Sequence, residues 1–137
     1  MASTDRNRGR LLEAIAAFNR GDLDAYLSSY APDAIIHGLP RDYGTSADGL
    51  RRFLEAMLAG LPDLQVTIED TVAEGDRVAV RMTYRGTHRG ELFGSAPTGR
   101  IIEWDGLTIR RFGADGRTVE RWIRNDTAGL LSQLGAG

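Results

Sequence analysis

Ionisable side chains gather in two segments of the chain that combine strand-like alternation with sharp turns. Residues 84–100 hold His88 between two glycines, and residues 121–135 hold Arg124 and Asp126. A carboxylate can accept and return a proton when burial brings its pKa nearer to neutrality, and an imidazole or guanidinium can stabilise an oxygen on which negative charge develops. We therefore predict a cavity in which Asp126, His88 and Arg124 are the catalytic residues.

The inward face of the last predicted strand decides whether these side chains can reach a cavity. Alternation places four side chains on one face of residues 118–126, namely Glu120, Trp122, Arg124 and Asp126. Trp122 is the largest apolar group of this strand, and burying it stabilises the fold more than burying Ile123 on the other face. We therefore expect the face with Trp122 to point inward, and a one-residue error would exchange the two faces.

Large apolar and polar side chains elsewhere are expected to contact a bound small molecule. His37 ends a short apolar strand just before a turn, which would place it at a sheet edge near the mouth of the cavity. The full set of predicted substrate contacts is His37, Phe53, Met57, Met82, Tyr84, Trp104, Glu120 and Trp122. Structural roles are the competing interpretation: a lone histidine is more often a hydrogen-bonded core or surface residue, and Arg124 with Asp126 could form an ion pair at the rim of the sheet.

The predicted elements that position these residues are helices in the first part of the chain and strands in the second. Apolar residues recur at helical spacing over residues 11–27 and again over residues 49–60. From there the period becomes two, with strands predicted at residues 64–70, 78–84, 101–112 and 118–126. Helices followed by antiparallel strands indicate a single α+β domain over residues 1–137, a curved sheet closed by helices, in which residues 1–9 could be disordered.

Composition removes several classes of function. The 137 residues contain no cysteine, so neither a disulfide nor a thiolate zinc site can form. The formal net charge of −2 gives no field that would attract nucleic acid, and no apolar run is long enough for a membrane span or a signal peptide. His37 and His88 lack the spacing of a metal motif, and no glycine-rich phosphate loop is present. We expect a cytoplasmic protein without metal or cofactor, whose partner is a hydrophobic small molecule rather than nucleic acid or a membrane.

The two segments that carry the ionisable residues also resemble those of the SnoaL-like polyketide and ester cyclases. The matching residues are Gly86-Thr87-His88, Gly90, Gly94, Pro97-Thr98-Gly99-Arg100, Trp122, Asp126 and Gly129-Leu130-Leu131. The resemblance implies a nuclear-transport-factor-2-like (NTF2-like) cone, in which N-terminal helices pack on a curved, mostly antiparallel sheet that encloses a pocket. It also implies a homodimer or homotetramer formed through the outer sheet face. The implied reaction is closure of polyketide rings by intramolecular aldol condensation, without cofactor or metal, with an aspartate as acid and base.

Two other functions remain open on the sequence. Arg124 and Asp126 on one strand face are similar to part of the aspartate–arginine–aspartate arrangement of limonene-epoxide-hydrolase-like relatives. The second acid would then have to come from Glu103, Asp105 or Glu120. The third function is a non-catalytic module that holds a hydrophobic small molecule. The direction of the Asp126 carboxylate discriminates among these functions, because a carboxylate that points out to the rim weakens both enzymatic hypotheses.

Overall fold

The computed structural model describes residues 2–135 and has the α+β architecture that the sequence predicts. Its elements in chain order are α1 (Ala2–Asn19), α2 (Leu23–Leu27), β1 (Tyr30–His37), a short 3₁₀ helix η1 (Arg41–Tyr43), α3 (Ala47–Gly60), β2 (Gln65–Glu74), β3 (Arg77–Thr87), β4 (Ile101–Phe112), β5 (Thr118–Asn125) and α4 (Thr127–Gln133). Residues 2–9, which could have been disordered on sequence grounds, form the first part of α1, and Met1 lies outside the described residues. No helix of the described part is long and apolar enough to span a membrane.

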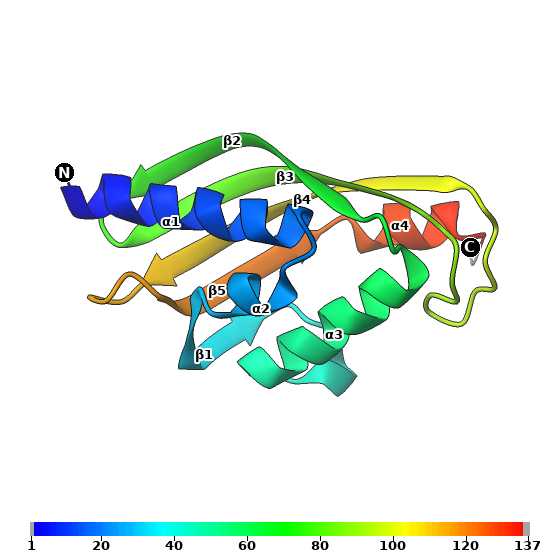
Figure 1. Cartoon of the computed structure of the whole chain (residues 1–137), viewed down its shortest axis with the longest axis horizontal. Helices are drawn as coiled ribbons and strands as arrows, with labels where there is room; N and C mark the ends of the chain where they lie inside the picture. Colours follow the sequence, from blue (N-terminus) through cyan, green and yellow to red (C-terminus); the bar gives the residue numbers. More distant parts are fainter. Residues whose placement is uncertain (1, 136–137) are drawn as a thin grey trace.

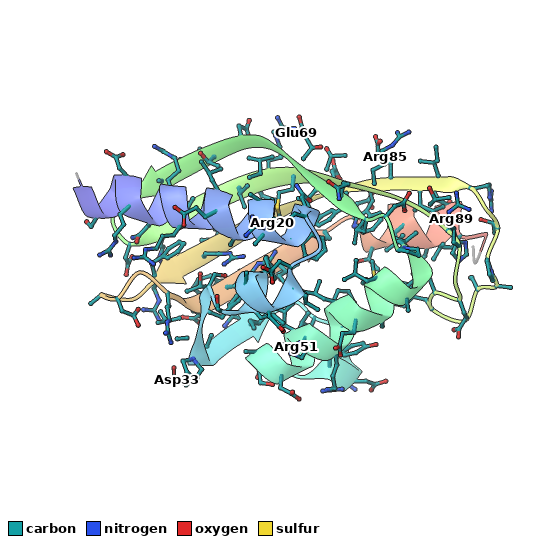
Figure 2. The ribbon with its side chains drawn as sticks, in the orientation of Figure 1. Arg20, Asp33, Arg51, Glu69, Arg85 and Arg89 are labelled. Carbon is teal, nitrogen blue, oxygen red and sulfur yellow. The ribbon has the colours of Figure 1, made fainter. Side chains whose placement is uncertain are left out.

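One five-stranded sheet forms the body of the protein, in the order β1-β5-β4-β3-β2. β1 runs parallel to β5, and the other neighbouring pairs are antiparallel. The strands curve, with α1, α2 and α3 on one side of the sheet and α4 at the end of β5 (Figure 1). Charged side chains such as Glu69 and Arg85 point away from this body (Figure 2). The arrangement confirms the predicted helices packed on a curved, mostly antiparallel sheet.

Polar caps fix where the helices begin. Asp22 accepts a hydrogen bond from a backbone N–H of α2 at 3.0 Å, and Ser46 accepts one from the Gly49 N–H of α3 at 3.1 Å. These side chains satisfy backbone donors that the start of a helix leaves free. Beyond Ser46, α3 buries Leu50 and Met57 in the core, so this helix forms one wall of the interior.

Burial along β4 alternates without interruption and sets the inward face of the sheet. The buried positions are Ile102, Trp104, Gly106, Thr108, Arg110 and Phe112, and the residues between them are exposed or, at Arg111, half-buried. Residues that pair across neighbouring strands share a face. Arg110 pairs with Arg121, and Ile109 pairs with Trp122. Arg121 and Ile123 of β5 are therefore buried, and the prediction that Trp122 points inward is wrong.

Trp122 makes its contacts on the outer face of the sheet instead. Its ring stacks on His37 with 5.5 Å between the ring centres, and the Arg77 guanidinium lies 5.3 Å from the indole. These contacts cover part of Trp122 and leave it half-buried. The size of one apolar side chain was therefore a weaker guide to orientation than the alternation of the neighbouring strand.

Candidate active site

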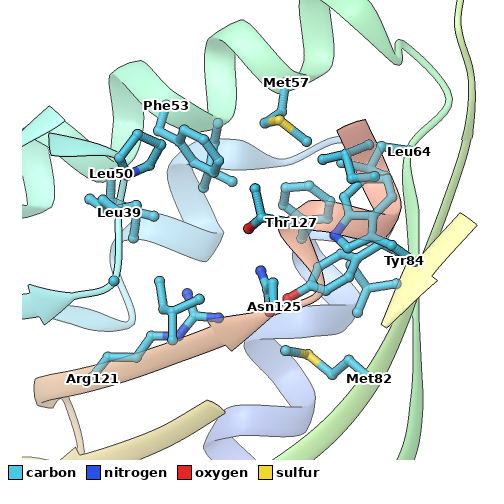
Figure 3. A pocket seen from close by; sticks show the side chains of 18 of the residues that line it. Leu39, Leu50, Phe53, Met57, Leu64, Met82, Tyr84, Arg121, Asn125 and Thr127 are labelled. Atoms are coloured by element: carbon cyan, nitrogen blue, oxygen red, sulfur yellow. The ribbon is translucent and has the colours of Figure 1, made fainter. Parts of the chain in front are cut away.

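A cavity of about 280 Å³ lies between the sheet and the helices. All four α-helices and strands β2, β3, β4 and β5 contribute residues to its wall, together with loop residues such as Leu39 and Phe93. The apolar residues that line it include Phe18, Leu50, Phe53, Met57, Val66, Met82, Trp104 and Ile123. Figure 3 shows Leu50, Phe53, Met57 and Met82 around the cavity. Such a cavity favours an apolar small molecule, because binding removes the apolar surface of both partners from water.

Few polar side chains line the cavity. Arg121 and Asn125 come from β5, Thr127 begins α4, and Tyr84 adds a phenol hydroxyl (Figure 3). Tyr26 of α2 adds a second phenol hydroxyl. Among the described residues that form the lining, Arg121 is the only charged one, and none is Asp, Glu or His. The cavity thus offers a cation and several hydrogen-bond donors, but no carboxylate.

Arg121 belongs to a buried group that we call the inner cluster: Tyr26, Tyr30, Arg110 and Arg121. Arg121 Nη1 donates to Tyr30 Oη at 3.0 Å and to Tyr26 Oη at 3.2 Å. Arg110 Nη2 donates to the same Tyr26 oxygen at 3.2 Å, and Arg110 Nη1 donates to two hydroxyl groups nearby. Arg110 is 1% exposed and Arg121 is 5% exposed. The two guanidiniums therefore meet at one phenol oxygen, away from water.

Neither arginine of the inner cluster forms an ion pair with a carboxylate in the described part of the chain. Burial lowers the pKa of the Arg121 guanidinium, but the neighbouring phenols raise it by more, so Arg121 stays charged. A buried charge without a counterion is costly, and the cost falls when an anion comes close. The inner cluster is therefore suited to an oxygen that carries negative charge.

Tyr84 and Asn125 add donors beside Arg121. Tyr84 stacks on Trp104 with 5.1 Å between the ring centres, and burial raises the pKa of the Tyr84 phenol, which keeps its proton. Asn125 lies over Gly106, where a Cβ would collide with Asn125 Oδ1. This buried amide oxygen has no hydrogen-bond partner among the described residues. A hydroxyl or enol of a ligand could supply that missing bond.

Five of the predicted substrate contacts line the cavity: Phe53, Met57, Met82, Tyr84 and Trp104. The first two come from α3, the next two from β3 and the last from β4. The sequence could predict that these five side chains face the cavity, because helical and strand periodicity show which residues share a face. Their part in binding a substrate stays a prediction.

The other three predicted contacts belong to a second group, on the outer face of the sheet, that we call the outer cluster: His37, Arg77, Arg111, Glu120 and Trp122. The His37 Nε2 and Glu120 Oε2 atoms are 2.7 Å apart, and Arg111 Nη2 donates to Glu120 Oε1 at 3.1 Å. The hydrogen bonds with His37 and Arg111 lower the pKa of the Glu120 carboxyl. The expectation that His37, Glu120 and Trp122 face the cavity is wrong, because β5 presents its other face inward and His37 of β1 pairs with Trp122 on the outer face.

Asp126 and Arg124, two of the predicted catalytic residues, are exposed and do not line the cavity. Asp126 is the N-cap of α4 and accepts a hydrogen bond from the Gly129 N–H at 2.9 Å. Arg124 Nη1 donates to the backbone oxygen of Ile123 at 2.7 Å. The predicted placement of both side chains is therefore wrong, and the exposed Asp126 carboxylate weakens both carboxylate-based mechanisms.

His88 is fully buried, but it holds a loop and is not a lining residue. Its Nδ1 lies 3.0 Å from Thr98 Oγ1 and accepts a hydrogen bond from the Thr98 N–H at 3.3 Å. His88 Nε2 has no hydrogen-bond partner in the described part of the chain. The imidazole thus ties together the two ends of residues 88–98, a loop from which Phe93 reaches the cavity. The expected place of His88 in the cavity is wrong.

Sequence reasoning missed the inner cluster. Arg110 and Arg121 were overlooked because charged residues are rarely buried. A signal was nevertheless present, since Arg110 continues the alternation of β4 in phase with Ile102 and Trp104. Orienting β4 first and then pairing β5 against it would have found Arg121 as well.

Comparison with known proteins agrees with this fold. The family model of SnoaL-like polyketide cyclases matches residues 9–134, so the chain belongs to this family, as its resemblance predicted. The solved structure of AclR, a proposed hydroxylase from Streptomyces galilaeus, has a TM-score of 0.89 and 33% identity, with 98% of this chain and 87% of AclR covered. No match was found among curated proteins.

Two further solved structures extend the comparison. IdmH, a proposed polyketide cyclase from Streptomyces antibioticus, has a TM-score of 0.82 and 36% identity, with 94% of this chain and 98% of IdmH covered. An NTF2-like protein from Burkholderia pseudomallei has a TM-score of 0.77 and 24% identity, with 94% of this chain and 97% of that chain covered. The predicted NTF2-like cone is thereby confirmed.

Proposed function

We propose that this chain is a cofactor-independent enzyme of the cyclase type that closes a ring in a hydrophobic, polyketide-derived molecule. Membership of the SnoaL-like family and the 36% identity with IdmH support this class of reaction. The observation that carries the proposal is the composition of the cavity wall. That wall is apolar except at Arg121 and the neutral donors around it, which include Tyr84 and Asn125.

Aldol ring closure needs a group that takes a proton from the carbon beside a carbonyl, and donors that stabilise first an enolate and then an alkoxide. Under this proposal Arg121, Tyr84 and Asn125 are those donors. Apolar walls exclude water, which strengthens the attraction between the Arg121 guanidinium and a developing enolate oxygen. The base is not an aspartate on this account, because Asp126 caps α4 and the described lining residues include no carboxylate.

A non-catalytic binding module is the second candidate. The lack of any carboxylate or imidazole among the described lining residues favours it. The epoxide-hydrolase hypothesis has less support, because that mechanism needs two acids at the ligand. Its candidates Glu103, Asp105 and Asp126 are exposed, and Glu120 lies in the outer cluster.

Turnover separates the two candidates. The test incubates the purified protein with aromatic polyketide precursors that carry a ketone or aldehyde within ring-forming reach of an activated methylene. Chromatography and mass spectrometry then follow the product, which we expect at unchanged mass or at a mass reduced by one water.

Binding can be measured in the same protein. In a Trp122→Phe variant the one remaining indole is that of Trp104, which lines the cavity, so its fluorescence reports occupancy. Ring-closed product together with Trp104 quenching would support the cyclase. Quenching without any product would contradict the cyclase and support the binding module.

A further inference from the structure

A buried pair of arginines that lacks a carboxylate needs another source of negative charge. Arg110 from β4 and Arg121 from β5 both donate to Tyr26 Oη, each at 3.2 Å. Tyr30 Oη lies 3.0 Å from the same oxygen, and the Arg110 guanidinium lies 4.5 Å from the centre of the Tyr30 ring. Tyr26 Oη is therefore the atom on which the positive charge of the inner cluster converges.

The hydrogen bonds of the inner cluster leave one phenol proton without an acceptor among residues 2–135. Tyr26 and Tyr30 share a single oxygen–oxygen contact, so only one of the two hydroxyls can donate to the other. The remaining contacts of both oxygens are with guanidinium N–H groups, which donate and never accept. A cluster with one proton fewer satisfies every one of these contacts, and Tyr26 Oη, which faces three donors, is the oxygen best placed to lack the proton.

We propose that Tyr26 rests as a phenolate between Arg110 and Arg121, and that it is the base that removes a proton from the carbon between the two carbonyls of a 1,3-dicarbonyl substrate. Of the two phenols in the inner cluster, Tyr26 is the one that lines the cavity. This inference rests on the proposed cyclase function and adds the base and the substrate class to it.

Electrostatics agrees with the geometry. Burial raises the pKa of the Tyr26 phenol, but the Arg121 and Arg110 guanidiniums and the hydrogen bond with Tyr30 outweigh burial, so the pKa lies below its usual value. Burial raises the pKa of the Tyr30 phenol, which keeps its proton and donates it to Tyr26. The charged or titratable groups that face Tyr26 are Arg110 on β4, Arg121 on β5, Tyr30 on β1 and Tyr84 on β3. Helix α1 faces Tyr26 with the apolar ring of Phe18, 5.5 Å away between ring centres.

Proton transfer to Tyr26 starts the reaction and its return ends it. The C–H bond of the activated methylene breaks, its proton moves to Tyr26 Oη, and its electron pair becomes an enolate whose oxygen binds Arg121 or Tyr84. The enolate carbon attacks the acceptor carbonyl and forms the new C–C bond, and the electron pair of that C=O becomes an alkoxide. Tyr26 returns the proton to the alkoxide and is a phenolate again, so no atom or electron is gained or lost.

The substrate class follows from the strength of the base. General base catalysis works best when the acidity of the proton donor is close to that of the conjugate acid of the base. A methylene between two carbonyls is about as acidic as a phenol, whereas a methylene beside a single ketone is a far weaker acid. A phenolate in an apolar cavity with an arginine beside it is therefore matched to 1,3-dicarbonyl compounds.

Tyrosine ionisation tests the resting phenolate without any substrate. The chain has four tyrosines, so protein labelled with ¹³C at tyrosine Cζ gives four signals that report the state of each phenol as the pH rises. We expect one signal to lie at the phenolate position already at neutral pH, and to stay there in Tyr30→Phe, Tyr43→Phe and Tyr84→Phe. This assignment does not require Tyr26→Phe to fold. Four phenols that are all protonated at neutral pH, or loss of the phenolate signal in one of these variants, would overturn the proposal.

Proton abstraction is tested with 1-phenylbutane-1,3-dione, whose enolate absorbs at longer wavelength than its neutral form. The wild-type protein should bind this probe as the enolate, and Tyr26→Phe should bind it neutral. Turnover of ring-forming substrates should fall about 10²–10⁴-fold in Tyr26→Phe, whereas Tyr43→Phe, which removes a phenol hydroxyl outside the inner cluster and outside the cavity lining, should keep it.

The two assays separate this inference from the proposed function. Enolate formation and turnover that are unchanged in Tyr26→Phe would overturn the role of Tyr26. A wild-type protein that shows the phenolate and ionises the probe, but closes no ring, would support Tyr26 as a base while the proposed cyclase function fails.

Discussion

Arginine and aromatic residues form a cluster against each face of β5, and the two clusters differ in how their charge is compensated. In the outer cluster, Glu120 accepts from Arg111 and shares a hydrogen bond with His37, close to solvent. In the inner cluster, Arg110 and Arg121 meet phenols and no carboxylate, at positions that are almost fully buried. Arginines at consecutive strand positions, such as Arg110 and Arg111, therefore have different roles. On the outer face their charge is compensated by a carboxylate, and on the inner face they form a site that attracts negative charge.

This difference indicates where function lies on the sheet. An ion pair near the surface contributes little to stability, and its charges are already compensated without a ligand. A buried cation with no carboxylate partner favours any step that brings negative charge close to it, as the formation of an enolate does. We therefore expect changes in the inner cluster to alter turnover, and changes on the outer face to alter stability or association.

Replacing Arg121 has the largest expected effect. Arg121→Gln keeps a hydrogen-bond donor but removes the charge from the cavity, so turnover of a ring-forming substrate should fall about 10²–10³-fold, as for the loss of one oxyanion donor. Arg124→Gln changes the same residue type on the exposed side of β5 and should keep the wild-type rate. Initial rates at saturating substrate measure both variants, and equal losses would contradict the distinction between the two faces.

Adding a methyl group at Gly106 displaces one donor of the cavity without changing any charge. The new Cβ would overlap Asn125 Oδ1, so Gly106→Ala should lower stability by about 1–3 kcal/mol and weaken ligand binding reported by Trp104. Gly9→Ala is the matched control, because Gly9 lies in α1 with open space around it and should stabilise the protein by about 0.5–1 kcal/mol. Urea unfolding measures both changes, and unchanged stability and affinity in Gly106→Ala would show that Asn125 is free to move.

Acid should weaken the outer cluster while leaving the arginines of the inner cluster charged. Hydrogen bonds with His37 and Arg111 lower the pKa of the Glu120 carboxyl from its usual 4.5. The ionised carboxylate therefore stabilises the folded protein above pH 4.5, and this stabilisation is lost as the pH falls through the lowered pKa. Glu120→Gln should therefore be less stable than the wild type at about pH 6, and the difference should shrink toward about pH 3. Urea midpoints across this range provide the measurement; a difference that does not depend on pH would contradict the assignment.

Association through the outer face should have the smallest effect on turnover. Ile35, Leu107 and Ile109 are exposed apolar residues of β1 and β4, and Ile109 pairs with the half-buried Trp122 across the sheet. We expect a homodimer or homotetramer that buries these side chains, and Leu107→Glu should convert it to a 15.0 kDa monomer with an intact cavity. Light scattering at micromolar concentration decides the question, and a monomeric wild-type protein would count against it.

Periodicity was sufficient for the fold but not for the site. The helix predicted over residues 49–60 and the strand over residues 101–112 correspond to α3 (Ala47–Gly60) and β4 (Ile101–Phe112), because both patterns are local. Both faces of β5 carry a large apolar residue and an arginine, so its own sequence does not show which face is buried. Pairing with β4 settles that question.

The contact between Tyr26 and Arg121 shows the same limit. It joins residues 95 positions apart and depends on the order of the whole sheet. No spacing or motif within either segment carries that information. Asp126 attracted the functional prediction because it is a conspicuous acid at the end of a strand, whereas its position explains it fully as the cap of α4.

The position of a bound 1,3-diketone tests the central claim most directly. A crystal structure of the protein with 1-phenylbutane-1,3-dione would show which side chains contact the two oxygens. The account predicts that one oxygen accepts a hydrogen bond from Arg121 or Tyr84, that the carbon between the carbonyls faces Tyr26 Oη, and that the phenyl ring packs among the apolar side chains of α3. A diketone that binds in the cavity with no contact to the inner cluster, or that binds on the outer face, would contradict it.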